Sequence, residues 1–255
     1  MPLTLIGCGI AYDLTLKGIE AIRSADAGEV YYETYTNPIP SEKEKISQLE
    51  QLTGKKFVKL VREHLESSYL VEKAKVRNAR VALLVSGDPL TATTHTTLVI
   101  ECRQKNIPVE IIHNSSIYAT APGKAGLQIY RFGKTATLVN PRENYKPIST
   151  FEIIRQNLER NLHTLVLLDT EPQPMEAIDA LKMLKEAGFK LELAVILSRL
   201  GWKDEKIKFG QIDSLIGKSL IDKSTIETDF GHSPFTIIIP AKLHMVEEEF
   251  LNFLA

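Results

Sequence analysis

Val81-Ala-Leu-Leu-Val-Ser-Gly-Asp-Pro-Leu-Thr-Ala-Thr-Thr-His95 is the stretch that decides the fold of this chain. Its first five residues, Val81 to Val85, are a short apolar run that predicts a strand buried on both faces. The run stops at Ser86-Gly87-Asp88-Pro89, a turn signal, and a helix is expected over about 91–105. In open α/β sheets, ligands bind beyond the carboxyl ends of the strands, at corners of this kind. The corner and its acid, Asp88, are therefore where fold and function are expected to meet.

Short apolar runs alternate with helical patterns along the rest of the chain, which predicts an α/β fold with a mostly parallel sheet and crossover helices. Strands are expected at Leu3–Ile6, Val30–Tyr32, Val109–Ile112, Leu165–Leu168, Leu193–Leu197 and Thr236–Ile239. Helices are expected at about 15–25, 41–52, 60–76, 174–188 and 243–254, with Thr15 as the first cap and Gly188 as a stop. In the last helix, Val246, Phe250 and Leu254 are expected to face the core and Glu247-Glu-Glu249 to face solvent.

The alternation breaks between Val139 and Pro147, where two prolines and two asparagines follow no helical or strand period. We therefore expect an N-terminal α/β domain over 1–138, a linker over 139–148 and a second α/β domain over 149–255.

Composition and charge exclude several classes of protein. With 44% hydrophobic and 25% charged residues, the chain resembles an ordinary globular protein. A net charge of -1 creates no electrostatic field that would attract nucleic acid or an anionic membrane. No apolar run approaches the ~18 residues of a membrane span. The N-terminus lacks the pattern of a signal peptide. Because Cys8 and Cys102 lie far apart and the six histidines are scattered, we expect no metal site and a reducing cytoplasm.

Gly7-Cys8-Gly9 follows the first predicted strand and invites comparison with a dinucleotide-binding loop. That fingerprint needs a third glycine at position 12, which is Tyr12 here, and the helix is expected to begin only near Thr15. A purely structural turn and a backbone that passes close to a ligand both remain possible. Cys8 has no basic partner near it in sequence, so it is not expected to act as a nucleophile.

The polar residues at the other corners also have two interpretations. Asp88 can cap the following helix, or it can hydrogen-bond a hydroxyl or an ammonium group of a ligand. Asn114-Ser115-Ser116 is interpreted as polar groups at the end of a third strand. His95, His113 and His163 are expected to cap or hydrogen-bond locally.

Taken together, the corners resemble the diphthine synthase family, whose enzymes are of the tetrapyrrole-methylase type. The resemblance is carried by Gly7–Ile10, Asp13–Ile22, Tyr32–Thr36, Gly87–His95, His113–Ile117, Gly126–Thr135, His163–Asp169 and Lys242–Glu247. These segments run in order from the first strand to the last helix, and the compact length resembles archaeal members.

The resemblance implies a fold, a cofactor and a partner. The fold is two α/β domains with S-adenosylmethionine in the cleft between them, in a homodimer. The reaction implied is methylation of the amino group of an aminocarboxypropyl-modified histidine on translation elongation factor 2, a step in making diphthamide. The family's cofactor contacts fall on Ile10, Asp88, Thr91, Ser116, Ile117, Leu168, Leu200 and Phe235.

Three positions depart from the family pattern. The segment between Gly9 and Asp13 is about two residues short, and Leu200 stands where a smaller side chain is common. Phe235 stands where histidine is usual, with His232 three residues earlier, and either could serve.

No residue is singled out as catalytic. Transfer from a sulfonium requires the donor and a neutral amine to be held in line, and desolvation could neutralise the amine without a dedicated base. The alternatives are a tetrapyrrole or ribosomal RNA methyltransferase of the same fold, and a non-catalytic binding module.

Overall fold

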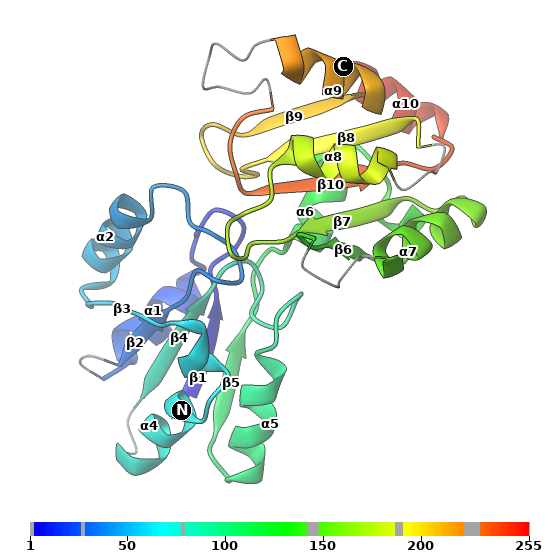
Figure 1. Cartoon of the computed structure of the whole chain (residues 1–255). Helices are drawn as coiled ribbons and strands as arrows, with labels where there is room; N and C mark the ends of the chain where they lie inside the picture. Colours follow the sequence, from blue (N-terminus) through cyan, green and yellow to red (C-terminus); the bar gives the residue numbers. More distant parts are fainter. Residues whose placement is uncertain are drawn as a thin grey trace. The chain divides into compact units, whose positions relative to one another are not determined.

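The computed structural model describes residues 3–26, 29–77, 80–141, 148–186, 191–221 and 230–254. They form two compact units, the first ending at Ile117 and the second beginning at Tyr118. Figure 1 labels the helices and strands of each unit.

Unit 1 contains a parallel sheet, as predicted, and this sheet has five strands in the order β3-β2-β4-β1-β5. The strands are β1 (Leu3–Gly7), β2 (Val30–Tyr32), β3 (Val58–Lys59), β4 (Val81–Val85) and β5 (Val109–Ile112). The helices are α1 (Leu16–Ser24), α2 (Glu42–Thr53), α3 (Arg62–Leu65), α4 (Tyr69–Arg77) and α5 (Thr96–Gln104). Every residue of β1 and β4 is buried, which confirms the prediction from the apolar run. Thr15 caps α1 as predicted, since its hydroxyl accepts from Gly18 N at 3.0 Å.

Helices cover both faces of this sheet because side chains alternate along each strand. Leu3, Leu5, Leu83 and Val85 pack in one core with Leu70 of α4 and Cys102 of α5. On the other face, Gly18 of α1 lies so close that a β-carbon there would stand 3.2 Å from Ile6 Cγ2.

Two predicted helices of unit 1 differ in extent from those observed. The helix expected over 91–105 begins only at Thr96, because the preceding residues form turns in which Thr93 Oγ1 donates to Pro89 O at 3.0 Å. The helix expected over 60–76 is split into α3 and α4, and Ser67 Oγ donates to His64 O at 3.1 Å at the break.

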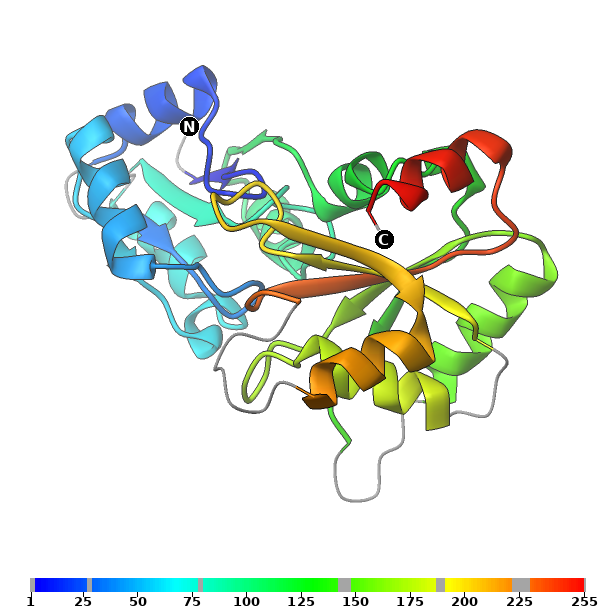
Figure 2. The ribbon, with the colours of Figure 1, turned by 90° about the horizontal axis from the view of Figure 1, so that it is seen from above.

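Unit 2 contains a mixed sheet in the order β6-β7-β10-β8-β9, in which only β6 and β7 are parallel. Its strands are β6 (Ala136–Leu138), β7 (Thr164–Leu168), β8 (Leu193–Ser198), β9 (Lys206–Gln211) and β10 (Phe235–Ile239). Its helices are α6 (Ile117–Lys124), η1 (Ile129–Arg131), α7 (Ile148–Glu159), α8 (Ala177–Glu186), α9 (Ile212–Ile221) and α10 (Met245–Asn252). Figure 2 shows α6 and α10 on one face of this sheet and α7, α8 and α9 on the other.

The division between the units differs from the predicted boundary at 139–148. β6 lies in the predicted N-terminal domain, but it pairs with β7 and belongs to the second sheet. The Pro- and Asn-rich break thus follows an edge strand and does not separate two cores. Most of the predicted linker, residues 142–147, lies outside the described residues, as does the predicted helix stop at Gly188.

The prediction for the faces of the last helix is confirmed for Glu248 and Glu249, which are exposed, and is wrong for Val246, Phe250 and Glu247. Val246 and Phe250 are 54% and 43% exposed, whereas Glu247 is completely buried. Its carboxylate accepts hydrogen bonds from His244 N at 2.8 Å, Gln128 N at 3.1 Å and His163 Nε2 at 3.3 Å, and it pairs with the Arg131 guanidinium. A buried charge is tolerated when it is paired and hydrogen-bonded in this way, so α10 turns Glu247 inward.

Candidate functional site

The carboxyl ends of β1 and β4 are joined by their glycines. Gly9 N donates to Gly87 O and Gly87 N donates to Gly9 O, both at 3.0 Å. The two residues have φ angles of +67° and +69°, which glycine adopts without strain. At Gly7 a β-carbon would stand 2.8 Å from Gly87 O. The glycines therefore allow two loops to lie directly against each other, which supports a structural role for the Gly7-Cys-Gly turn.

The loop after Gly9 does not have the form of a dinucleotide site. Tyr12 is buried with a φ of +59°, and its hydroxyl donates to Glu33 O at 3.4 Å. Because α1 begins only at Leu16, no helix N-terminus directly follows the glycines. Burial raises the pKa of the Cys8 thiol far above its usual value, so this side chain stays protonated and unreactive.

Asp88 lies at the end of β4, and its carboxylate is fully engaged by unit 1. Oδ1 accepts from Leu90 N at 3.0 Å and from Thr91 Oγ1 at 3.1 Å. Oδ2 contacts His113 Nδ1 at 2.7 Å and accepts from Asn114 N at 3.4 Å. Burial alone would raise the pKa of Asp88, but these hydrogen bonds outweigh it and the pKa lies below its usual value. Asp88 therefore organises the corner as a carboxylate, and it does not cap α5.

The end of β5 holds the loop after β1 in place. Asn114 Nδ2 donates to Gly7 O and to Asp13 O, both at 3.0 Å. Ser115 Oγ accepts from Ile10 N at 3.3 Å. Because β4 and β5 flank β1 in the sheet, these contacts join three strand ends into one preformed corner.

The structure brings together the five predicted contact residues of unit 1, namely Ile10, Asp88, Thr91, Ser116 and Ile117. Ile10, Asp88, Thr91 and Ser116 lie on the loops that follow β1, β4 and β5, and Ile117 is the first residue of α6. Asp88 is buried, and the other four are half-buried and available for contact. The described residues contain no group of three or more metal-ligating side chains, and no helix among them is long and apolar enough to span a membrane.

The three predicted contacts of unit 2 also share one edge of a sheet. Leu168 ends β7, Phe235 begins β10 opposite Ser198, and Leu200 follows two residues after Ser198. All three are less than 10% exposed, and Phe235 packs in the core with Leu168. His232 lies close to this edge, because its backbone N–H donates to Ser198 Oγ at 3.1 Å.

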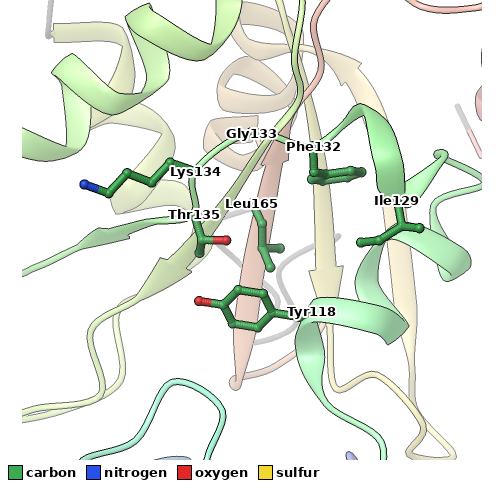
Figure 3. A pocket seen from close by; sticks show the side chains of 7 residues that line it. All are labelled: Tyr118, Ile129, Phe132, Gly133, Lys134, Thr135 and Leu165. Atoms are coloured by element: carbon green, nitrogen blue, oxygen red, sulfur yellow. The ribbon is translucent and has the colours of Figure 1, made fainter.

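A hollow of about 490 Å³ lies elsewhere in unit 2 (Figure 3). It is lined by Tyr118, Ile129, Phe132, Gly133, Lys134, Thr135 and Leu165. Leu165 belongs to β7, as does Leu168, but it stands three positions before the predicted contact. Figure 3 shows Lys134 directed away from the other side chains, and the hollow contains none of the predicted site residues.

The pairing of His113 with Asp88 was missed, since His113 was expected to hydrogen-bond locally. A possible signal was present: an acid and a histidine follow two apolar runs of one parallel sheet, and such strands end at the same edge. His163 and His95 are both buried, and His163 Nδ1 accepts from Ala241 N at 2.9 Å.

Comparison with known proteins agrees with this arrangement. Residues 2–216 match the model of the family described as Tetrapyrrole (Corrin/Porphyrin) Methylases. The chain is 41% identical to diphthine synthase from Staphylothermus marinus, covering 98% of this chain and 92% of the relative. It is 39% identical to diphthine synthase from Methanocaldococcus jannaschii, covering 99% and 98%. A crystal structure of diphthine synthase superposes with a TM-score of 0.84 at 34% identity, covering 99% and 95%. The chain belongs to the tetrapyrrole methylase family and, within it, to the diphthine synthases.

Proposed function

We propose that this protein methylates the amino group of the aminocarboxypropyl-modified histidine of translation elongation factor 2, with S-adenosylmethionine as the methyl donor. The observation that carries the proposal is similarity to diphthine synthases over nearly the whole length of both chains. A match confined to one domain would support only the fold and the cofactor.

We infer that the methyl donor lies at the corner of unit 1 formed by Ile10, Asp88, Thr91, Ser116 and Ile117, and that Leu168, Leu200 and Phe235 of unit 2 also contact it. The corner leaves space beside Gly87 for such a ligand. A β-carbon added to Gly87 would lie 3.8 Å from the nearest atom, Ser115 O. Thr91 and Ser116 offer hydroxyl and main-chain groups there, whereas Asp88 has committed its carboxylate to Leu90, Thr91, His113 and Asn114. Asp88 thus acts by fixing the loops that meet the cofactor. When bound, the cofactor supplies a methyl group on a sulfonium.

We also infer a homodimer formed through an exposed apolar face of unit 2. Large apolar side chains are exposed at Ile129 (55%), Tyr130 (76%), Met245 (75%), Val246 (54%), Phe250 (43%) and Phe253 (83%). The two segments that carry them lie side by side, because a β-carbon on Gly126 would stand 2.2 Å from the Phe250 ring and Gln128 N donates to Glu247. Exposed patches of this kind mark association sites. A Phe253→Glu, Val246→Glu variant should sediment as a monomer with its fold intact, and an unchanged mass would refute this interface.

The cytoplasm is the inferred location, because the proposed substrate acts in translation and Cys8 and Cys102 are both free thiols.

The experiment that tests the function uses elongation factor 2 that carries the aminocarboxypropyl histidine, incubated with labelled S-adenosylmethionine and this protein. Mass spectrometry should show mass increases of one or more methyl groups on that histidine. Transfer to a tetrapyrrole or to ribosomal RNA in parallel reactions would support the rival enzymes. Binding of the cofactor without transfer to any of these would support a binding module.

A further inference from the structure

Asp88 and His113 form a hydrogen-bonded pair at the carboxyl edge of the sheet in unit 1. The Asp88 Oδ2 atom stands 2.7 Å from His113 Nδ1, which is the shortest of the four contacts to this carboxylate. The two side chains differ in exposure: 10% for Asp88 and 67% for His113. A buried acid therefore holds an exposed imidazole.

This geometry fixes which nitrogen of His113 carries the proton in the neutral ring. Asp88 is held ionised by its hydrogen bonds, so it can only accept, and Nδ1 must donate. The Nε2 atom then keeps its lone pair, and the described residues place no hydrogen-bond partner on it. An acid that holds an imidazole in one tautomer and orientation, with the other nitrogen free, is the arrangement of a general base.

We propose that His113 Nε2 is the general base that removes a proton from the amine before each methyl transfer. The inference rests on the proposed function. His113 takes one proton from the ammonium group, and becomes an imidazolium stabilised by Asp88. The nitrogen lone pair of the amine then forms the N–C bond to the methyl carbon while the S–C bond breaks and its electron pair stays on sulfur. The exposed imidazolium returns the proton to water.

Other titratable side chains near this edge suit the role less well. Asp13, on the loop after β1, lies 3.7 Å from the Lys45 ammonium and, among the described residues, has no orienting partner like that of His113. Glu33 follows β2 and is completely buried, and His95 is 1% exposed. Burial raises the pKa of Glu33 to about 7 and lowers the pKa of His95 to about 4. His113 is the histidine at this edge that combines exposure with an orienting acid.

The test variant is His113→Asn in the full-length protein. The asparagine amide nitrogen can take the place of Nδ1 and still donate to Asp88, so the corner is kept and only the base is lost. The matched control is His244→Asn, another exposed histidine, at the N-cap of α10, where asparagine also caps. Single-turnover methylation of the modified elongation factor is measured at pH 7.5 and pH 9.5, and S-adenosylmethionine affinity is measured by calorimetry.

The expected result is a loss of about 100-fold or more at pH 7.5 in His113→Asn, with cofactor affinity within about twofold of the wild type. The fall in methylation rate should be smaller at pH 9.5, because a larger fraction of an alkylamine with a pKa of about 10 is then already neutral. Within the described residues, Asp88 is the titratable side chain placed against His113, and it is ionised at both pH values. A His113→Ala variant should regain part of its rate with added imidazole.

Three outcomes would overturn the proposal: a rate within threefold of the wild type in His113→Asn, a deficit independent of pH, or no rescue of His113→Ala by imidazole. If the wild type itself transfers no methyl group to the factor, the proposed function fails, and this outcome is distinct from the other three.

Discussion

Replacing Glu247 by glutamine should destabilise unit 2 by about 3 kcal/mol. The carboxylate is completely buried and accepts four hydrogen bonds, from His244 N, Gln128 N, His163 Nε2 and Arg131. In glutamine one oxygen becomes an NH₂ group, which must then face two donors. Breaking a buried ion pair costs about 3–5 kcal/mol. We expect a cost at the lower end of this range, because Arg131 also donates a hydrogen bond to Lys242 O at 2.6 Å and keeps it in the variant.

The assay is urea unfolding followed by tryptophan fluorescence. The chain has one tryptophan, Trp202, and it lies in unit 2, so the signal reports on that unit. With a slope of about 2 kcal/mol per M, the midpoint should fall by about 1.5 M. The control is Glu248→Gln, an exposed neighbour on the same helix, which should change stability by less than about 0.5 kcal/mol.

The difference between wild type and variant should also depend on pH. Burial alone would raise the pKa of Glu247, but hydrogen bonds from His244 N and Gln128 N and the nearby His163 lower it below its usual value. The carboxylate therefore stabilises the fold above the ordinary glutamate pKa of about 4.3, and this stabilisation is lost as the pH falls through the folded pKa. A loss below 1 kcal/mol at pH 7, or a loss that grows on acidification, would refute this reasoning.

Three further predictions concern single residues. Asp88→Ala should weaken S-adenosylmethionine binding at least tenfold in calorimetry, because it frees Leu90, Thr91, His113 and Asn114 at once, and near-normal affinity would contradict the role given to the corner. Gly133→Ala should cost about 1–3 kcal/mol in urea unfolding, since its β-carbon would stand 2.2 Å from Asn157 Oδ1, whereas Gly123→Ala, with nothing within 4 Å, should cost nothing. The thiol of Cys8 should resist iodoacetamide in the folded protein and react only on unfolding, as followed by mass spectrometry, because burial raises its pKa and shields it.

Sequence patterns were sufficient for the central strands and failed for elements set by distant contacts. β1, β4 and β5 were predicted because a short apolar run flanked by turn residues has few possible structures other than a buried strand. β3 has only two residues, and β9 is an edge strand with the exposed Lys206, so neither stands out as an apolar run. Three successive glutamates are typical of a solvated helix face. The burial of Glu247 depends on Arg131, which is far away in sequence and cannot be inferred from local period.

The same reasoning applies to the site. The corners were located from the sequence because turn residues follow strands, and in a parallel sheet these ends gather at one edge. The role of Asp88 could not be deduced, because a carboxylate after a strand looks alike whether it meets a ligand or a histidine. The sequence indicates that Asp88 and His113 follow strands that end at one edge, but the strand order, with β4 and β5 on either side of β1, is needed to bring His113 within reach of Asp88.

The reciprocal bonds between Gly9 and Gly87 have a consequence for the motions of unit 1. Each amide hydrogen is held by the carbonyl of the other residue, so neither can exchange with deuterium unless the pair separates. One opening event releases both, so the two amides should show the same protection factor although they belong to distant parts of the chain. The loop after β1 and the loop after β4 therefore behave as one cooperative segment. A ligand that restricts the motion of one loop restricts the motion of the other as well.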